Sequence, residues 1–188
     1  MLLETPESYY KAMKVFCDKS EEIIITTFGV FCGFTIDNDL SNRFLTEDRN
    51  FIDSIADNNR ISIIVGVAGF SPCKNGCDQC GIAYARRTLR IERHRQEYPN
   101  FNWYLCESLH SKVASFKIKN DFYSIIGSRN FTGSTNKEMA IVINDQKSSK
   151  SLYDYTNNLK NESVPVTIDS CIESVIKNSD IKYVELVI

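Results

Sequence analysis

The residues with the clearest chemical use in this chain are a histidine and a lysine two positions apart, His110 and Lys112. We expect both to lie on a strand that begins here, where they would share one face about 6–7 Å apart. An imidazole can act as a nucleophile or a proton carrier near neutral pH, and a lysine supplies a positive charge for a phosphoryl oxygen. An ordinary edge-strand histidine beside a solvated lysine is the alternative.

More polar residues follow the next apolar run. Strands at 112–118 and 122–126 are expected to form a hairpin turned at 119–121, which brings the segment after it back toward His110. A glycine at the strand end allows a tight turn that exposes backbone N–H groups. Hydroxyl and amide side chains there can donate hydrogen bonds to phosphoryl oxygens, and a carboxylate can fix the histidine tautomer. These additional candidates are Ser128, Asn130 and Glu138.

The combined pattern resembles the phospholipase D superfamily, whose signature is His-x-Lys, an Asp five residues on, and then Gly-Ser-x-Asn. The resemblance covers about residues 103 to 145, through His110-Ser-Lys112 and Gly127-Ser-Arg-Asn130. The chain departs from it at Lys117, where the family has Asp, and its Lys-to-Gly segment is three residues longer than usual. Asp121 is a candidate for a displaced acid. This departure resembles the branch that contains metal-independent restriction endonucleases and other nucleases.

The resemblance implies a two-step displacement that uses no cofactor. His110 would attack phosphorus to give a phosphohistidine, and the histidine of a second half-site would protonate the leaving group and then activate water. Lys112 and Asn130 would hold phosphoryl oxygens, with Ser128 assisting and Glu138 orienting the imidazole. The chain has one such motif, so we expect a homodimer with an isologous contact to supply the second. A decayed, inactive half-domain is the alternative.

A second cluster has three cysteines within eight residues, Cys73, Cys77 and Cys80. Thiolates at this spacing suit a tetrahedral zinc ion, which would brace the loop structurally because four protein ligands leave no open position for water. Cys32 is the favoured fourth ligand if the strands before the two segments are parallel neighbours. His94 and Cys106 are the other candidates. Reduced loop thiols and a redox pair are the alternatives to zinc.

Arginines also recur at helical spacing in the helix expected at 82–97. Arg86, Arg90 and Arg93 share one face, and an arginine binds two phosphate oxygens with its planar guanidinium group. Arg129 could extend this basic surface. We interpret it as a nucleic-acid contact, with DNA preferred over RNA, and a solvated helix face is the alternative.

Composition restricts the fold class. A chain of 188 residues with 43% apolar and 24% charged residues suits one globular domain. We therefore expect a single phospholipase-D-like domain over residues 1–188, with a Cys-rich insertion at about 71–82. Alternating helices and strands predict an α/β (α+β sandwich) fold in which helices flank a mixed central sheet. The expected helices are 9–19, 44–58, 82–97 and 149–160, and the other expected strands are 22–30, 61–70, 103–105 and 140–143.

The net charge of −2 excludes a basic field over the whole chain. We see no signal peptide and no membrane span, and expect a cytoplasmic protein, or one in a host cytoplasm if it is phage-encoded. The leading hypothesis is a dimeric, metal-independent endonuclease. A lipid or small-molecule phosphodiesterase is the second, and a zinc-braced nucleic-acid-binding protein with a vestigial site is the third.

Overall fold

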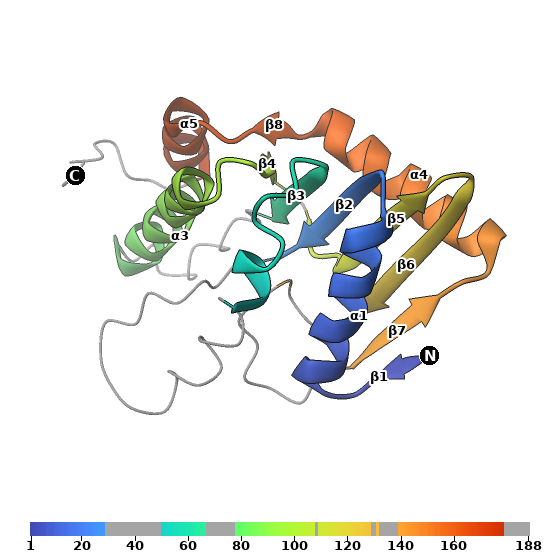
Figure 1. Cartoon of the computed structure of the whole chain (residues 1–188). Coiled ribbons are helices and arrows are strands. Elements are labelled where there is room, and N and C mark those ends of the chain that lie inside the picture. The colour runs from blue at the N-terminus through green and yellow to red at the C-terminus, as the bar shows by residue number, and fades with distance from the viewer. Residues whose placement is uncertain (29–49, 67–77, 108, 129–130, 132–138, 179–188) are drawn as a thin grey trace.

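The computed structural model describes residues 1–28, 50–66, 78–107, 109–128, 131 and 139–178, with only the helical backbone of 78–87. The helices are α1 (Pro6–Lys19), α3 (Asp78–Glu97), α4 (Gln146–Glu162) and α5 (Ile168–Asn178), with a helical turn at 50–53 (Figure 1). The strands are β1 (Leu2–Leu3), β2 (Glu22–Thr27), β3 (Ile61–Gly66), β4 (Asn102–Cys106), β5 (Val113–Ile118), β6 (Asp121–Gly127), β7 (Ala140–Ile143) and β8 (Val164–Pro165).

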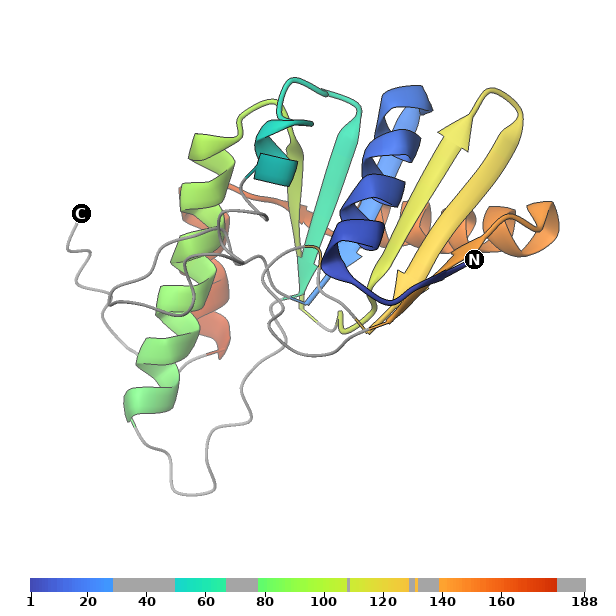
Figure 2. The same ribbon diagram turned by 60° about the horizontal axis from the view of Figure 1, so that its bottom comes forward.

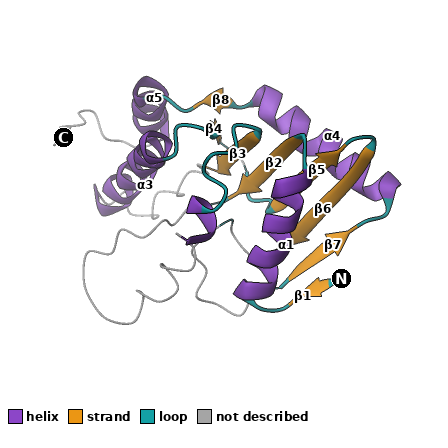
Figure 3. Ribbon diagram, in the orientation of Figure 1, coloured by secondary structure: helices purple, strands orange, loops and turns teal. Residues whose placement is uncertain are grey.

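The eight strands in the described part of the chain form one mixed sheet, ordered β1-β7-β6-β5-β2-β3-β4-β8 (Figure 3). β2, β3 and β4 pair in parallel, and each remaining pair is antiparallel. As a result, β2, β3, β4 and β6 end at the same edge of the sheet, where β5 and β7 begin. We call this the carboxyl edge. Ligand sites of open α/β sheets lie at such an edge.

Helices cover both faces of the sheet, with α1 on one face and α4 on the other (Figure 2). Alternate residues of β2 therefore enter different cores: Ile23 and Ile25 pack beneath α1, while Ile24 packs with Tyr153 of α4. This double burial explains why β2 and β3 are nearly continuous apolar runs. The expected mixed sheet with flanking helices is confirmed.

Local sequence signals fix the helix that covers the first face. Thr5 caps α1 by accepting from the Ser8 backbone N–H at 3.1 Å, Ser8 accepts from Thr5 in return, and Pro6 occupies the first turn. α4 is anchored to β2 by a carboxylate: Glu22 accepts from the Tyr153 hydroxyl and from Lys160 Nζ, the latter at 2.7 Å.

Several boundaries differ from those expected from the sequence. The helix expected at 44–58 is helical only over 50–53 in its described part and continues as a turn, because Asp57-Asn58-Asn59 favours turns. β1 and β8 were not predicted, since two residues are too few for a periodic pattern. α3 begins four residues earlier than expected. Among the described helices, none combines the length and the apolar character needed to cross a bilayer.

Candidate functional site

His110, Lys112, Gly127 and Ser128 form the described part of the candidate active site, which we call the half-site. It lies at the carboxyl edge, where the β5–β6 hairpin opens. Val113 pairs with Ile126, and the Gly127 N–H donates to the Lys112 carbonyl at 3.3 Å. The hairpin therefore places Gly127 and Ser128 beside the segment that carries His110 and Lys112, as expected. The hairpin turns at Lys119 and Asn120, where Lys119 adopts a φ of 55°.

His110 and Lys112 do not lie on the strand, however. β5 begins at Val113, so the pair precedes it, and the expectation of one shared strand face was wrong. The Lys112 ammonium instead donates to the His110 carbonyl oxygen at 3.0 Å. The His110 side chain is exposed and that of Lys112 is half-buried.

Two threonines at the end of β2 hold this segment in place. The Thr26 hydroxyl accepts from the Val113 N–H at 3.0 Å and from the Ser111 hydroxyl at 3.2 Å, and it lies 3.3 Å from the Val113 carbonyl. The Thr27 hydroxyl accepts from the Phe131 N–H at 3.0 Å. β2 is thus tied both to the segment before β5 and to the residue that follows the Gly-Ser-x-Asn motif.

Close backbone packing requires glycine at two positions on this edge. A Cβ atom on Gly127 would lie 2.3 Å from the Met139 carbonyl oxygen, and one on Gly66 would lie 2.2 Å from the Leu109 carbonyl oxygen. The Ser128 N–H donates to the same Met139 oxygen at 3.1 Å. The backbone at Gly127 and Gly66, close to Ser128 and His110, is therefore packed too tightly to admit a Cβ atom.

The acid of the family signature has no substitute at the half-site among the described residues. Lys117 pairs in register with Glu22, at the opposite end of β5 from Lys112. Asp121 pairs with Ile118 at that same far end and is exposed, so the idea that it is a displaced acid of the site was wrong. Lys117 instead adds to the positive charge around Glu22. Burial by itself would raise the pKa of Glu22, but hydrogen bonds from Lys160 and Tyr153 and the charges of Lys160 and Lys117 outweigh it and lower the pKa.

Three expected members of the site, Asn130, Glu138 and the flanking Arg129, lie outside the described residues. The same holds for Cys32, Cys73 and Cys77, and for the side chains of Cys80 and Arg86. Cys32 was favoured as the fourth zinc ligand if the strands before it and before Cys73 are parallel neighbours. These strands, β2 and β3, do pair in parallel. The two strands that precede Cys32 and Cys73 in the sequence therefore both end at the carboxyl edge.

Of the two rival zinc ligands, His94 is fully buried in α3 and stacks on Trp103, with ring centroids 6.4 Å apart. That position suits a core histidine rather than a metal ligand. Cys106 is half-exposed at the end of β4, on the carboxyl edge.

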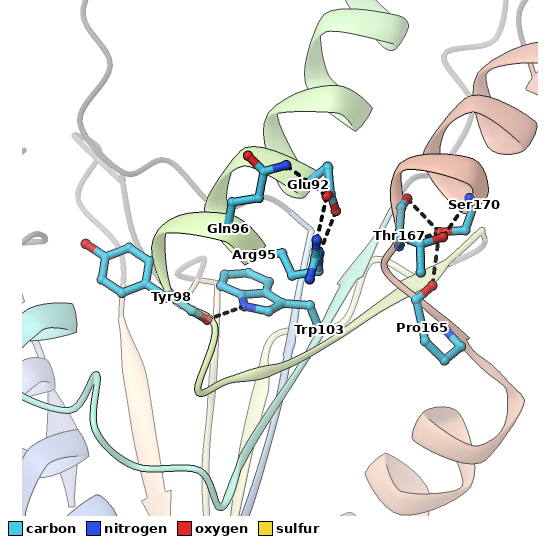
Figure 4. A network of polar contacts seen from close by, with 8 residues as sticks. All are labelled: Glu92, Arg95, Gln96, Tyr98, Trp103, Pro165, Thr167 and Ser170. Atoms are coloured by element: carbon cyan, nitrogen blue, oxygen red, sulfur yellow. Dashed lines mark hydrogen bonds and ion pairs between the residues drawn. The ribbon is translucent and has the colours of Figure 1, made fainter.

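The arginine face of α3 is exposed where the structure describes it. Arg90 and Arg93 both face solvent. Arg95 belongs to a different face: its guanidinium group binds both oxygens of the buried Glu92 at 2.7 Å, close to α5 (Figure 4). Glu92 and Arg95 thus serve the contact between α3 and α5, whereas Arg90 and Arg93 lie on the exposed part of the helix surface.

Sequence reasoning missed Phe28, which directly follows Thr26 and Thr27. Its ring is tilted by 46° against the His110 imidazole, with centroids 4.7 Å apart, and the Lys112 ammonium lies 5.6 Å from its centroid. A signal was present, because Thr-Thr-Phe ends a buried strand whose carboxyl end marks the usual site edge.

No protein-family model and no curated protein sequence matches the chain. Several solved structures, however, are similar to this chain in fold. NucT from Helicobacter pylori is 17% identical, with a TM-score of 0.50 over 88% of this chain and 98% of its own. Nuc from Salmonella typhimurium, a phospholipase D family member, is 15% identical, with a TM-score of 0.52 over 88% of this chain and 96% of its own. Polyphosphate kinase from Porphyromonas gingivalis is 12% identical, with a TM-score of 0.54 over 89% of this chain and 26% of its own.

The first two matches span almost the full length of the proteins concerned. They agree with the mixed eight-stranded sheet and its helices on both faces. This chain therefore has the fold of the phospholipase D family member Nuc, and at the carboxyl edge of the sheet it places its His-x-Lys motif together with Gly127 and Ser128, the described part of its Gly-Ser-x-Asn motif.

Proposed function

We propose that this protein is a metal-independent phosphodiesterase, specifically an endonuclease that cleaves nucleic acid through a phosphohistidine intermediate. The observation that carries the proposal is the assembly of His110, Lys112 and Gly127-Ser128 at one edge of this fold. Each group suits a phosphodiester: a nucleophilic imidazole, an ammonium group for the anionic oxygens, and a hydroxyl that donates a hydrogen bond.

In the proposed first step, an imidazole nitrogen of His110 attacks phosphorus and the bond to the leaving oxygen breaks. The histidine of a second half-site protonates that oxygen as it leaves. In the second step the same histidine takes a proton from water, whose oxygen attacks phosphorus and releases His110. Lys112, Ser128 and Asn130 stabilise the phosphoryl oxygens through both steps, and Glu138 orients the imidazole.

The second half-site would come from a second copy of this chain. An exposed apolar surface next to Ser128 supports this part of the proposal. It consists of Met139, Ile141 and Leu2, with 60%, 44% and 49% of their surface exposed. Leu2 and Ile141 are direct cross-strand partners, and the Met139 carbonyl accepts from the Ser128 N–H. Apolar groups gathered on a surface favour a protein contact, and this one continues into the half-site.

A charge substitution tests this surface. Ile141→Glu should make the protein monomeric in sedimentation velocity and remove its activity. Val15→Glu is the matched control, because Val15 is 45% exposed on α1 and equally apolar. A dimer that survives Ile141→Glu would exclude this surface as the contact.

Nucleic acid is the proposed substrate because Arg90 and Arg93 project from α3 into solvent. Guanidinium groups bind phosphate backbones, and each neutralised phosphate contributes to a salt-dependent affinity. We propose DNA in preference to RNA. No described feature favours a lipid substrate.

The deciding experiment incubates the protein with plasmid, single-stranded DNA and RNA in EDTA. Cleavage should persist in EDTA and disappear in His110→Ala and Lys112→Met, while Lys150→Met, exposed on α4, should retain it. Each variant is first checked for a wild-type melting temperature. Binding without cleavage by the folded wild-type protein would instead indicate a nucleic-acid-binding protein with a vestigial site, and hydrolysis of phospholipid vesicles alone would indicate a lipid phosphodiesterase.

A further inference from the structure

The His110 side chain projects from an irregular segment, so something other than a strand must fix its orientation. Among the described residues, the Phe28 ring contacts the His110 imidazole, at a centroid distance of 4.7 Å. The Lys112 ammonium lies over the same ring at 5.6 Å and also donates to the His110 carbonyl. Phe28 is therefore shared by the two chemical groups of the half-site.

The backbone under Phe28 is well fixed. It follows Thr26 and Thr27, whose hydroxyls hold the segments before β5 and after β6 with hydrogen bonds of 3.0–3.2 Å. Phe28 is half-buried, and its ring meets the His110 imidazole. A rigid aromatic ring at this point limits the rotamers that His110 can adopt.

We propose that Phe28 is a positioning residue that orients the His110 imidazole and holds the Lys112 ammonium beside it. This inference rests on the proposed function, which it deepens. The negative face of an aromatic ring attracts an ammonium group, and offset or tilted ring pairs are favoured. A leucine would keep the apolar volume without the aromatic face, whereas a tyrosine would keep both.

Kinetics of phosphodiester hydrolysis supply the first test. Misplacement of a reacting group lowers the rate of the chemical step, and shifts of about 1 Å can cost about a hundredfold. For Phe28→Leu we expect kcat to fall about tenfold with KM within about twofold, since the substrate still meets Lys112 and the arginines. Phe28→Tyr should stay within about threefold of wild type. Equal kcat values for Phe28→Leu and wild type would overturn the proposal.

Nuclear magnetic resonance supplies a test that needs no activity. The chain has two histidines, so the ring Cε1–H region holds two signals, and the one absent from His110→Ala belongs to His110. Its chemical shift should carry the ring current of Phe28, move in Phe28→Leu, and stay near the wild-type value in Phe28→Tyr. A cross-relaxation signal between Phe28 and His110 ring protons should appear in the wild-type protein itself.

The two readouts separate the possible failures. An unchanged His110 signal in Phe28→Leu, or no cross-relaxation in wild type, overturns the positioning role whether or not the protein is an enzyme. A signal that moves as expected in a protein that cleaves no phosphodiester supports the positioning of His110 and refutes the proposed function instead. Because the wild-type cross-relaxation measurement needs no substitution at Phe28, it remains informative even if Phe28→Leu folds poorly.

Discussion

Adding one methyl group at Gly127 should disable the half-site without touching a chemical group. In Gly127→Ala, the new Cβ would lie 2.3 Å from the Met139 carbonyl oxygen and 2.8 Å from the Ala140 Cα. Ordinary contacts begin near 3.4 Å, and both neighbours are backbone atoms, so β6 and β7 must separate by about 1 Å.

That separation has two measurable consequences. Overpacking of this kind costs about 1–3 kcal/mol, which corresponds to a fall in melting temperature of about 2–12 °C for a chain of this size. It also displaces Ser128, whose N–H donates to the same carbonyl. A shift of about 1 Å in a positioning group lowers the rate by up to about a hundredfold.

The assay compares kcat/KM for bis(p-nitrophenyl) phosphate in EDTA, together with thermal unfolding. Asp121→Ala is the control, because Asp121 lies on the same strand at its far end and is exposed. It should leave both quantities close to wild type. If Gly127→Ala also left both unchanged, the tight contact between β6 and β7 at the half-site would be refuted.

Three further outcomes are expected. The lowered pKa of Glu22 means that its stabilising contribution is complete above its ordinary pKa of 4.5 and is lost as pH falls through the lowered folded-state pKa. The free energy of unfolding, measured against pH, should show this acid-side loss in the wild-type protein and less of it in Glu22→Gln. Burial raises the pKa of the Cys17 thiol to about 12, so thiol labelling of the native protein should modify the half-exposed Cys106 and spare Cys17, and rapid labelling of Cys17 would contradict its burial. Metal analysis of protein purified without chelator should find about one zinc per chain if the cysteine loop binds it, whereas a metal-free, folded sample would remove that idea.

Much of the fold follows from apolar runs in the sequence. The strands near Glu22 and Ile61 are visible because burial on both faces leaves few polar positions in them. The hairpin is equally visible, since Lys119 and Asn120 separate two alternating segments. β1 could not be predicted from the sequence, because Leu2–Leu3 becomes a strand only through pairing with β7, which lies far away in the chain.

Part of the candidate site could also be predicted from the sequence. His110, Lys112 and Ser128 can be chosen by residue type and motif, and the hairpin brings them together. The positions of these residues relative to one another also depend on contacts with the end of β2, however. Thr26 binds Ser111 and Val113, and Phe28 contacts His110, through a sheet pairing that no local pattern encodes. β5 begins at Val113, so His110 lies before the strand rather than on it.

The most direct measurement concerns a dimer with one intact and one altered half-site. Wild-type and His110→Ala chains carrying different tags would be co-expressed, and the mixed dimer isolated by both tags. If two half-sites form one active centre, the mixed dimer lacks either nucleophile or acid and should retain no more than about a hundredth of the wild-type kcat. Activity near half that of wild type, or failure of the two chains to associate, would contradict a shared site.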